Sequence, residues 1–290
     1  MVLKQKSAAM VAVVVAIFGV CGAFVSYARA DLKLEQTVHV SGVPKMDNGK
    51  MSVEKPTTEI TVMYYKNGKQ RIETADSVMI HDTATEKTFL LNPPKKTYYE
   101  APSAASVATD PSNPMAQMAE LDGDVVVTDL KEDKSILGKK AHHYSYVMTL
   151  KFTVKDPKAP AMMASFLPSF VIIGDQWMAE VPDSLAFAKR NTQSVFEGLP
   201  SGLGKNFQTL TGKMGTMKGI PLEMTHSSKM SFGESAPAMI KEQMPKEPTV
   251  RKTTTTSLSE DPLPDALFVV PDDYKKVTAP GVVKKSPNAA

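Results

Sequence analysis

The sequence predicts a mainly β protein built on antiparallel strands. Residues 58–100 read as strand, turn, strand, turn, strand. Within them, Asn67-Gly68 is the strongest short hairpin signal, because both residues tolerate the positive φ angles of a tight turn. Upstream, apolar and polar residues alternate with a period of two, and the apolar face carries Leu32, Leu34, Val38 and Val40. A second layer must cover the apolar face of such a sheet, and that layer decides whether the protein has a solid core or a pocket.

The other predicted strands lie in the second half of the chain. They cover residues 125–127, 140–154, 171–181, 220–232 and 249–258. A turn at Leu137-Gly138 is expected between the first two of these strands. We expect a single domain over residues 31–276. Residues 277–290, rich in Lys, Pro and Ala, are expected to form a disordered tail.

Short helices are predicted as insertions between the strands, near residues 101–121, 159–169 and 183–198. In the first insertion, Pro114 occupies the first turn of a helix, where a missing N–H is tolerated. In the third, Asp183 can cap the N-terminus and apolar residues recur at helical spacing. A further short helix is expected over residues 235–244. Six glycines in residues 198–219 predict a mobile loop.

The first 30 residues have the pattern of an export signal peptide. Lys4 and Lys6 precede an apolar run of 18 residues, 8–25, and Ala28-Arg29-Ala30 supplies the small-x-small pattern that signal peptidase cuts. Cleavage there leaves Asp31 as the first mature residue, so a periplasmic or secreted protein is expected. The run 8–25 is also long enough to remain as an inner-membrane anchor, which is the alternative.

Charge and cysteine content exclude two classes of protein. Cleavage after residue 30 removes three of the 34 basic residues and none of the 31 acidic residues, so the mature chain is formally neutral. It therefore lacks the basic footprint of a nucleic-acid-binding protein. The single cysteine, Cys21, lies within the signal peptide, so disulfide bonds do not stabilise the mature chain. Its stability must come from buried apolar area.

The sequence contains no recognisable catalytic or metal-binding motif. It has no His-Glu-x-x-His sequence, and its five histidines are spread over several predicted strands. His142 and His143 are adjacent, but neighbouring residues of a strand point to opposite faces, so at most one of them joins any one site. No nucleophile and base occur at a recognisable spacing. We therefore predict a protein that is not an enzyme and that uses no metal or cofactor.

The 18 methionines support two interpretations. Met115/Met118 and Met214/Met217 form two Met-x-x-Met pairs, and thioethers bind Cu(I), so copper binding is one hypothesis. In the other interpretation the methionines are adaptable apolar filler, which also suits a pocket for variable apolar ligands. Most of them lack a nearby histidine, which favours the second interpretation.

Several short sequences follow one another in an order that resembles a known group of proteins. They are Met79-Ile80-His81-Asp82, Phe89-Leu90-Leu91-Asn92, Lys96-Thr97-Tyr98-Tyr99, Gly174-Asp175-Gln176-Trp177-Met178-Ala179, Gly219-Ile220-Pro221-Leu222-Glu223-Met224 and Phe268-Val269-Val270-Pro271-Asp272-Asp273-Tyr274. Over most of residues 31–276 the chain resembles the exported bacterial families that share the fold of the periplasmic lipoprotein carrier and its outer-membrane acceptor. The resemblance implies a mainly β (α+β) fold in which a curved antiparallel sheet forms an incomplete barrel and short helices cover its concave face.

The resemblance also implies where a ligand binds. In the carrier proteins, acyl chains are held between the sheet and its covering helices, and here the helices around Met115, Met162-Met163-Phe166 and Leu185-Phe187 are candidates for the cover. The ligand-binding residues predicted on this basis are Met115, Met118, Met162, Met163, Phe166, Trp177, Leu185 and Phe187.

The leading hypothesis is a non-enzymatic cell-envelope protein that holds a lipid, an acyl chain or a lipidated peptide and associates peripherally with the membrane. Burial of one CH₂ group contributes roughly 0.8 kcal/mol, so one long chain gives micromolar binding without specific polar contacts. The alternative is an envelope sensor or scaffold domain with a filled core that binds another protein, because pocket and core positions look alike in sequence.

Overall fold

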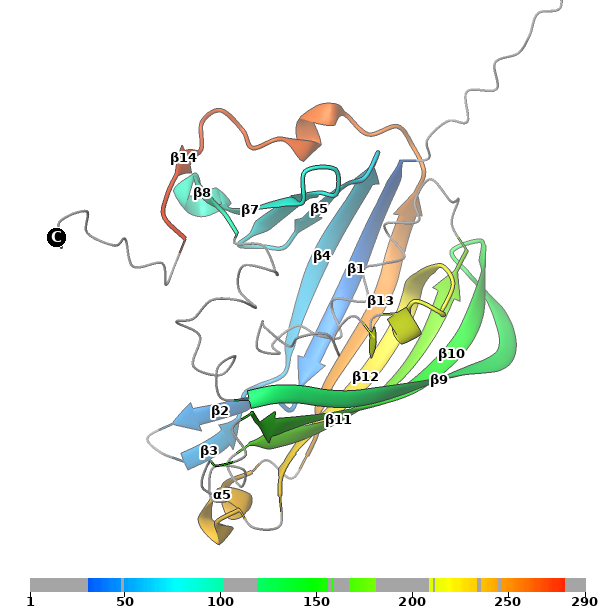
Figure 1. Cartoon of the computed structure of the whole chain (residues 1–290). Helices are drawn as coiled ribbons and strands as arrows, with labels where there is room; N and C mark the ends of the chain where they lie inside the picture. The colour runs from blue at the N-terminus through cyan, green and yellow to red at the C-terminus, as the bar shows by residue number, and fades with distance from the viewer. Residues whose placement is uncertain are drawn as a thin grey trace, which may run out of the picture.

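The computed structural model describes residues 31–47, 50–101, 119–155, 158, 167–180, 209–210, 212–233, 236–244 and 247–279. The protein is mainly β, and its large sheet is not closed into a barrel (Figure 1). The strands of this sheet are β1 (Leu32–Ser41), β4 (Thr57–Lys66), β5 (Lys69–Glu73), β6 (Val78–Asp82), β7 (Lys87–Asn92), β8 (Thr97–Glu100), β9 (Ala119–Ile136), β10 (Lys139–Val154), β11 (Pro168–Ala179), β12 (Ile220–Phe232), β13 (Thr249–Ser259) and β14 (Lys275–Lys276). The other elements are the hairpin of β2 (Pro44–Asp47) and β3 (Lys50–Val53), the helix α5 (Ala238–Gln243), and the 3-10 helices η1 (Pro93–Lys95) and η4 (Asp265–Phe268).

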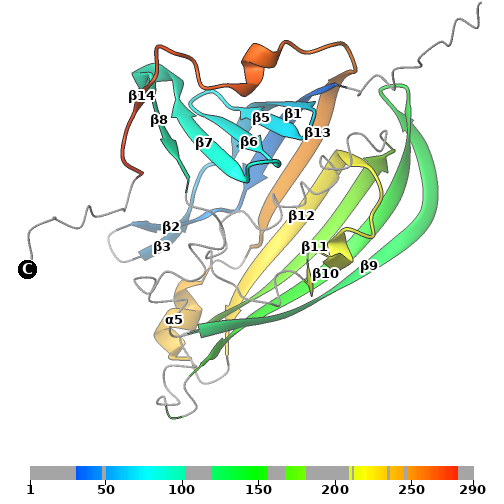
Figure 2. The ribbon, with the colours of Figure 1, turned by 45° about the horizontal axis from the view of Figure 1, so that its top comes forward.

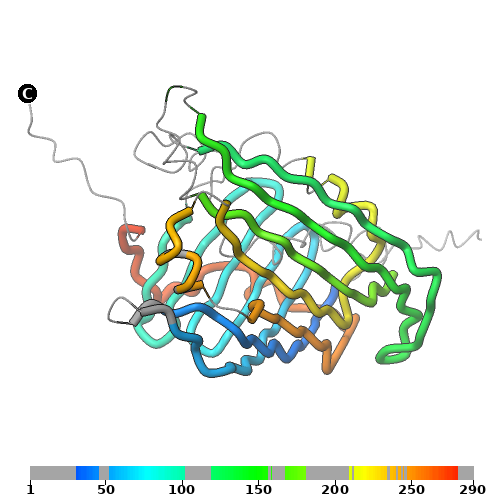
Figure 3. The backbone as a smooth tube through the Cα atoms, turned by 90° about the horizontal axis from the view of Figure 1, so that it is seen from below, coloured from blue at the N-terminus to red at the C-terminus, as the bar shows by residue number. Residues whose placement is uncertain are grey.

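The sheet has two halves joined through β1, and all its strand pairs are antiparallel except β14 with β8, which is parallel. Its strand order is β14-β8-β7-β6-β5-β4-β1-β13-β12-β11-β10-β9, so β1 pairs with β4 on one side and with β13 on the other. The predicted turns are confirmed. Asn67 and Gly68 (φ 49° and 78°) join β4 to β5, and Leu137 and Gly138 (φ 50° and 75°) join β9 to β10. The sheet is curved (Figure 3). Tyr65 and Tyr146 lie on the same face of it, which we call the inner face.

On the second half of the sheet, β9–β11, the chain itself covers the inner face (Figure 2). Leu210, Met214 and Met217 are at most 2% exposed and pack against inward side chains of these strands. The strand residues of this cluster are Ala119, Leu121, Val125, Tyr144, Tyr146, Met148, Leu150, Phe152, Ile172 and Met178. The prediction of a mobile loop is wrong for this part of residues 198–219. Leu210, Met214 and Met217 recur at i, i+4 and i+7, a helical spacing that places all three on one apolar stripe despite the glycines between them.

On the first half of the sheet, β5–β8, the chain covers the outer face instead. Residues 261–279, which we call the C-terminal strap, cross this face after β13 (Figures 1 and 2). The packed residues are Val78, Ile80, Phe89, Leu91 and Tyr98 from the sheet and Val270 and Tyr274 from the strap. Arg71 Nη1 donates a hydrogen bond to the Leu267 carbonyl at 2.9 Å, and Val277 N donates to the Tyr98 carbonyl at 2.8 Å. The strap is therefore bonded to the sheet as far as the first residue of the predicted tail; residues 280–290 lie outside the described ranges.

The described residues do not show the short helices that were predicted near 101–121, 159–169 and 183–198 as the cover of the inner face. The helix α5 confirms the helix expected over residues 235–244, and it lies at the end of the sheet near β2 and β3 (Figure 1). Residues 209–210 and 212–214 are helical as well. The insertion near 101–121 ends early because residues 119–121 already belong to β9, where buried Ala119 and Leu121 alternate with exposed acids. The insertion near 159–169 is also shortened, since β11 begins at Pro168. The rest of these two insertions, the insertion at 183–198 and the signal peptide lie outside the described residues.

A close approach at Gly174 gives a first testable prediction. Gly174 of β11 lies opposite Tyr146 of β10, and a Cβ added at Gly174 would lie 2.0 Å from the ring atoms Cε1 and Cζ of Tyr146. Tyr146 is 1% exposed and has little room to move, so Gly174→Ala should destabilise the fold by about 1–3 kcal/mol. Urea unfolding measures this. Gly212→Ala is the control, because a Cβ there meets nothing within 4 Å. Equal unfolding midpoints for the two variants would contradict the packing described.

Candidate functional site

A cavity of about 650 Å³ opens on the inner face beside the hairpin that joins β9 to β10. Val127, Tyr144 and Met178 form its apolar wall. The remaining lining is polar or charged and consists of Asp129, Asp133, Lys139, Lys140, His142, Glu180, Thr216 and Lys218. Ligand pockets of this size commonly combine apolar walls with a few polar groups that orient the ligand. The cavity can therefore accept an amphipathic molecule.

An irregularity in β9 concentrates charge at this cavity. Asp133 pairs with His142 and Asp129 pairs with Tyr144, so two acids four residues apart on β9 face positions only two apart on β10. Lys131, between the acids, has a φ of 61°, as expected where extra residues bulge out of a strand. In a regular strand, a spacing of four residues would separate the two acids by about 13 Å. The bulge instead brings both carboxylates to the same histidine.

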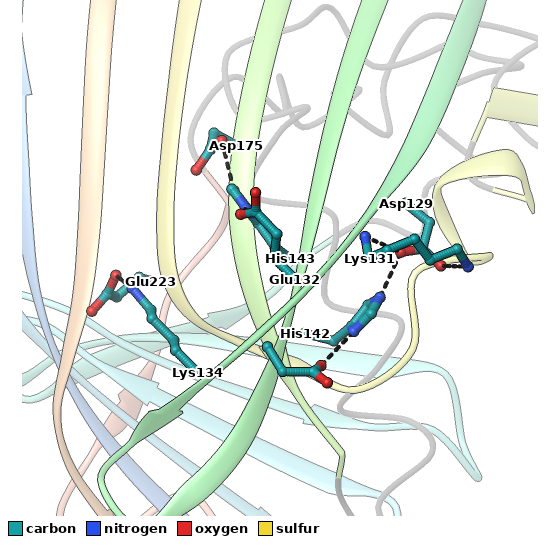
Figure 4. Close-up of polar contacts among 9 residues, drawn as sticks. Asp129, Lys131, Glu132, Lys134, His142, His143, Asp175 and Glu223 are labelled. Carbon is teal, nitrogen blue, oxygen red and sulfur yellow. Dashed lines mark hydrogen bonds and ion pairs between the residues drawn. The ribbon is translucent and has the colours of Figure 1, made fainter.

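His142 lies between these two carboxylates (Figure 4). Its Nδ1 is 2.6 Å from Asp133 Oδ1 and its Nε2 is 2.5 Å from Asp129 Oδ1. An imidazole ring donates from both nitrogens only when it is protonated, so this geometry selects the cation. The hydrogen bonds to Asp133 and Asp129 raise the pKa of His142 above its ordinary value.

Lysines hold the two carboxylates in their charged form. Lys131 Nζ lies 2.5 Å from Asp129 Oδ2, and Lys140 Nζ lies 2.9 Å from Asp133 Oδ2. The bonds from Lys131 and His142 lower the pKa of Asp129, and those from Lys140 and His142 lower the pKa of Asp133. The hairpin end of the cavity is therefore a network of paired charges.

His143 belongs to a separate cluster on the outer face, as the alternation of a strand predicts (Figure 4). Its ring stacks on Trp177 with centroids 4.1 Å apart and an interplanar angle of 11°. Its Nδ1 lies 2.8 Å from Glu132 Oε2, and its Nε2 lies 2.9 Å from Asp175 Oδ2. Burial acts to lower the pKa of His143, but the hydrogen bonds to Glu132 and Asp175 outweigh it and raise the pKa.

Trp177 is the one predicted ligand-binding residue within the described ranges, and it does not line the inner face. On the outer face, Lys134 Nζ lies 4.2 Å from the centroid of its ring. The inward positions of β11 are instead the buried Ile172, Gly174, Gln176 and Met178. The structure therefore corrects the expectation for Trp177. The other predicted residues lie outside the described ranges: Met115, Met118, Met162, Met163, Phe166, Leu185 and Phe187.

The residues that form the cavity were not predicted from the sequence. Met178 could have been predicted from the sequence, because it follows Trp177 on the same strand and points to the opposite face. Only the choice of face was wrong. Val127 and Tyr144 also lie on predicted strands, and their alternation shows that each shares a face with other apolar residues. The acids that flank His142 carried no such signal, because their position depends on the bulge in β9.

The methionine pair Met214/Met217 lies in the core. Met217 Sδ accepts a hydrogen bond from Gln176 Nε2 at 2.9 Å, and both methionines are at most 2% exposed. This placement agrees with the interpretation as apolar filler, whereas Met115 and Met118 lie outside the described residues. Within the described ranges no group of three or more His, Cys, Asp or Glu side chains could hold a metal ion.

No protein-family model matches the chain, and a search of curated proteins finds no similar sequence. Among the helices of the described residues, none is both long enough and apolar enough to cross a membrane.

The carboxylate bonds of His142 predict a pH dependence. Because its pKa is raised on folding, the stabilisation is complete below the ordinary pKa of 6.5 and is lost as the pH rises through the folded value. The pKa values of Asp129 and Asp133 are lowered, so their contribution is complete above 3.8 and is lost as the pH falls through their folded values. The hydrogen bonds of His142 to Asp129 and Asp133 should therefore stabilise the fold most between about pH 4 and 6.5.

An NMR titration of the ring signals measures this dependence. The pKa of His142 should lie above 6.5 in the wild-type protein and should fall in the Asp129→Asn/Asp133→Asn variant. Asp175→Asn is the matched control, since it removes a partner of His143 and leaves those of His142 in place. An unchanged His142 titration in the double variant would show that the two acids do not hold the ring.

Proposed function

We propose that the protein is a non-enzymatic binding protein of the cell envelope that holds a lipid, an acyl chain or a lipidated peptide on the inner face of its sheet. One observation carries the proposal, the cavity of about 650 Å³ that joins an apolar wall to a charged lining. The cavity volume is in the range typical of ligand pockets. The envelope location rests on the export pattern of residues 1–30.

The energetics favour a ligand with an apolar chain. Ten CH₂ groups buried against such a wall contribute about 8 kcal/mol, which corresponds to a dissociation constant in the micromolar range. The charges of the lining are largely paired with one another, so they orient a ligand at the mouth without each having to be neutralised by it. Lys139 is also paired, with Glu260 at 2.8 Å.

The extent of the site is limited by the residues that fill the rest of the inner face. Leu210, Met214 and Met217, which we call the plug, occupy the surface of β9–β11 next to the cavity. A ligand chain therefore binds beside this plug and not along the whole half of the sheet. On the first half of the sheet, Ile72, Met79 and Leu90 share the inner face and are only half-buried, which provides further apolar surface for a longer chain.

A sensor or scaffold domain is the second candidate, and two observations favour it. The core of β9–β11 is filled by the chain itself. In addition, Val126, Val147 and Ile173 lie opposite one another on three neighbouring strands of the outer face and are 60%, 47% and 56% exposed. Contiguous exposed apolar residues of this kind are typical of surfaces that meet another protein.

Neighbouring valines of β9 offer a sharp test of the binding function. Val127 lines the cavity, whereas Val126 points to the outer face. Val127→Lys should weaken binding of a fluorescent fatty acid at least tenfold, because it places an ammonium group against the apolar wall. Val126→Lys should leave the affinity unchanged. Titration of lipid-free protein followed by fluorescence measures both dissociation constants.

The wild-type titration decides between the two candidate functions. Saturable binding that Val127→Lys weakens and Val126→Lys leaves intact supports a lipid-binding protein. Absence of saturable binding to the wild-type protein removes this proposal and leaves the scaffold. A melting temperature measured for each variant shows whether a loss of binding comes from unfolding.

A further inference from the structure

Four inner-face positions form a row across neighbouring strands in the middle of the second half of the sheet. Tyr146 of β10 pairs with Gly174 of β11, Gly174 pairs with His226 of β12, and His226 pairs with Arg251 of β13. Thr253 lies two residues further along β13, on the same face as Arg251. Polar side chains from three strands therefore gather at one place on an otherwise apolar face.

Three of these side chains carry a buried polar atom without a hydrogen-bond partner. Tyr146, His226 and Thr253 are 1%, 8% and 4% exposed. Among the described residues, Tyr146 OH, His226 Nδ1 and Thr253 Oγ1 make no hydrogen bond. A buried polar atom without a partner destabilises the fold, and native proteins contain few of them. Three from one small region indicate that a partner is supplied from elsewhere.

The glycine in the row directs the tyrosine towards the other polar groups. Because Gly174 has no side chain, the ring of Tyr146 lies directly over it, with the hydroxyl oxygen 2.5 Å from where a Cβ would be. The hydroxyl thus extends from β10 across β11, to within about one strand spacing, roughly 4.8 Å, of the strand that carries His226. A larger residue at position 174 would prevent this.

The described inward positions on the strands that carry the row include no acid. The inward positions of β10–β13 around the row are Tyr144, Met148, Ile172, Gln176, Met224, Ser228 and Thr255, and none of them is acidic. Burial, with a contribution from the positive Arg251, lowers the pKa of His226 to about 4, so its ring is neutral at physiological pH. Arg251 is the cationic side chain of the row, and two hydroxyls and an imidazole are its further hydrogen-bonding groups.

We propose that Tyr146, His226, Thr253 and Arg251 form a binding site for the carboxylate of an acyl ligand, with the ligand's chain lying on the apolar inner face. This inference rests on the function proposed above and specifies its ligand as a carboxylate-bearing amphiphile. A carboxylate accepts several hydrogen bonds through its two oxygens, which matches hydroxyl groups and a guanidinium gathered in one place. Binding would also give the unpartnered hydroxyls of Tyr146 and Thr253 an acceptor.

Competition experiments with two matched lipids test the site. Oleate and oleyl alcohol have the same chain and differ in the head group, and each is used to displace a fluorescent fatty acid from the purified protein. The wild-type protein should bind oleate at least tenfold more tightly than oleyl alcohol. Tyr146→Phe and Thr253→Val should each reduce this preference at least threefold. Oleyl phosphate, measured in parallel, should bind more weakly than oleate.

The stability of the ligand-free variants provides an independent readout. Both substitutions remove a buried hydroxyl that has no partner, so the melting temperatures should stay the same or rise. Tyr98→Phe and Thr254→Val are matched controls, because Tyr98 lies under the strap on the outer face and Thr254 points away from the inner face. Neither control should change the preference for oleate.

The possible outcomes separate this inference from the proposed function. Equal affinities for oleate and oleyl alcohol, or a preference that survives both substitutions, overturn the carboxylate site while leaving an acyl-binding protein. Tighter binding of oleyl phosphate overturns the assignment to a carboxylate. A lower melting temperature in both variants shows that the hydroxyls have partners in the free protein and also overturns it. Failure of both lipids to bind rejects the proposed function itself.

Discussion

The pairing of β1 with both β4 and β13 is the interaction on which the rest of the structure depends. The halves β4–β8 and β9–β13 each form from strands that are close in sequence, whereas β1 joins residues more than 200 positions apart, such as Val38 and Thr253. Contacts of this range close a very long loop, which makes them slow and entropically costly to form. Side chains reinforce the junction. Gln36 Nε2 donates to Thr255 Oγ1 at 3.0 Å, and Asp31, just before β1, accepts a hydrogen bond from Leu263 N at 2.7 Å. The first residue of the predicted mature chain and the start of the C-terminal strap are thus tied together.

An open sheet has two faces to cover, and the two halves of this one are covered on opposite sides. The strap packs on the outer face of β5–β8, and the plug of Leu210, Met214 and Met217 packs on the inner face of β9–β11. Within the part of the chain that the structure describes, neither cover extends over the whole sheet. The cavity lies where the plug ends, at residues such as Tyr144 and Met178, next to the charged end of the β9–β10 hairpin. The boundary of the cavity is therefore set in part by residues that also build the core, such as Tyr144 and Met178.

The sequence predicted most strands of the large sheet and the turns at Asn67-Gly68 and Leu137-Gly138. It missed the hairpin of β2 and β3, and it failed where two faces of a strand look alike. Asn67-Gly68 and Leu137-Gly138 marked their hairpins because positive φ angles restrict the residue type. On β11, by contrast, the outward set with Val171, Ile173 and Trp177 is as apolar as the inward set with Ile172 and Met178, so a period of two could not decide which set faces the core. The length of β9 was also hidden, because residues 129–134 carry a run of charges that reads as a loop and is held in the sheet by ion pairs. The contact of His142 with both Asp129 and Asp133 depends on a shift in register, which no pattern within one strand contains.

The polar row on the inner face bears on how such a protein balances stability against binding. Three buried atoms without partners, at about 1–3 kcal/mol each, represent a sum comparable to the whole free energy of folding of a typical domain. Phenylalanine and valine in place of Tyr146 and Thr253 would remove most of that penalty and would leave an ordinary apolar core. A ligand that bonds to these groups recovers the lost energy on binding, so the free protein is less stable and the complex is correspondingly tighter. In the proposed function, the apolar wall would supply affinity for any chain of sufficient length, and the unpartnered polar groups would make that affinity depend on what the chain carries at its end.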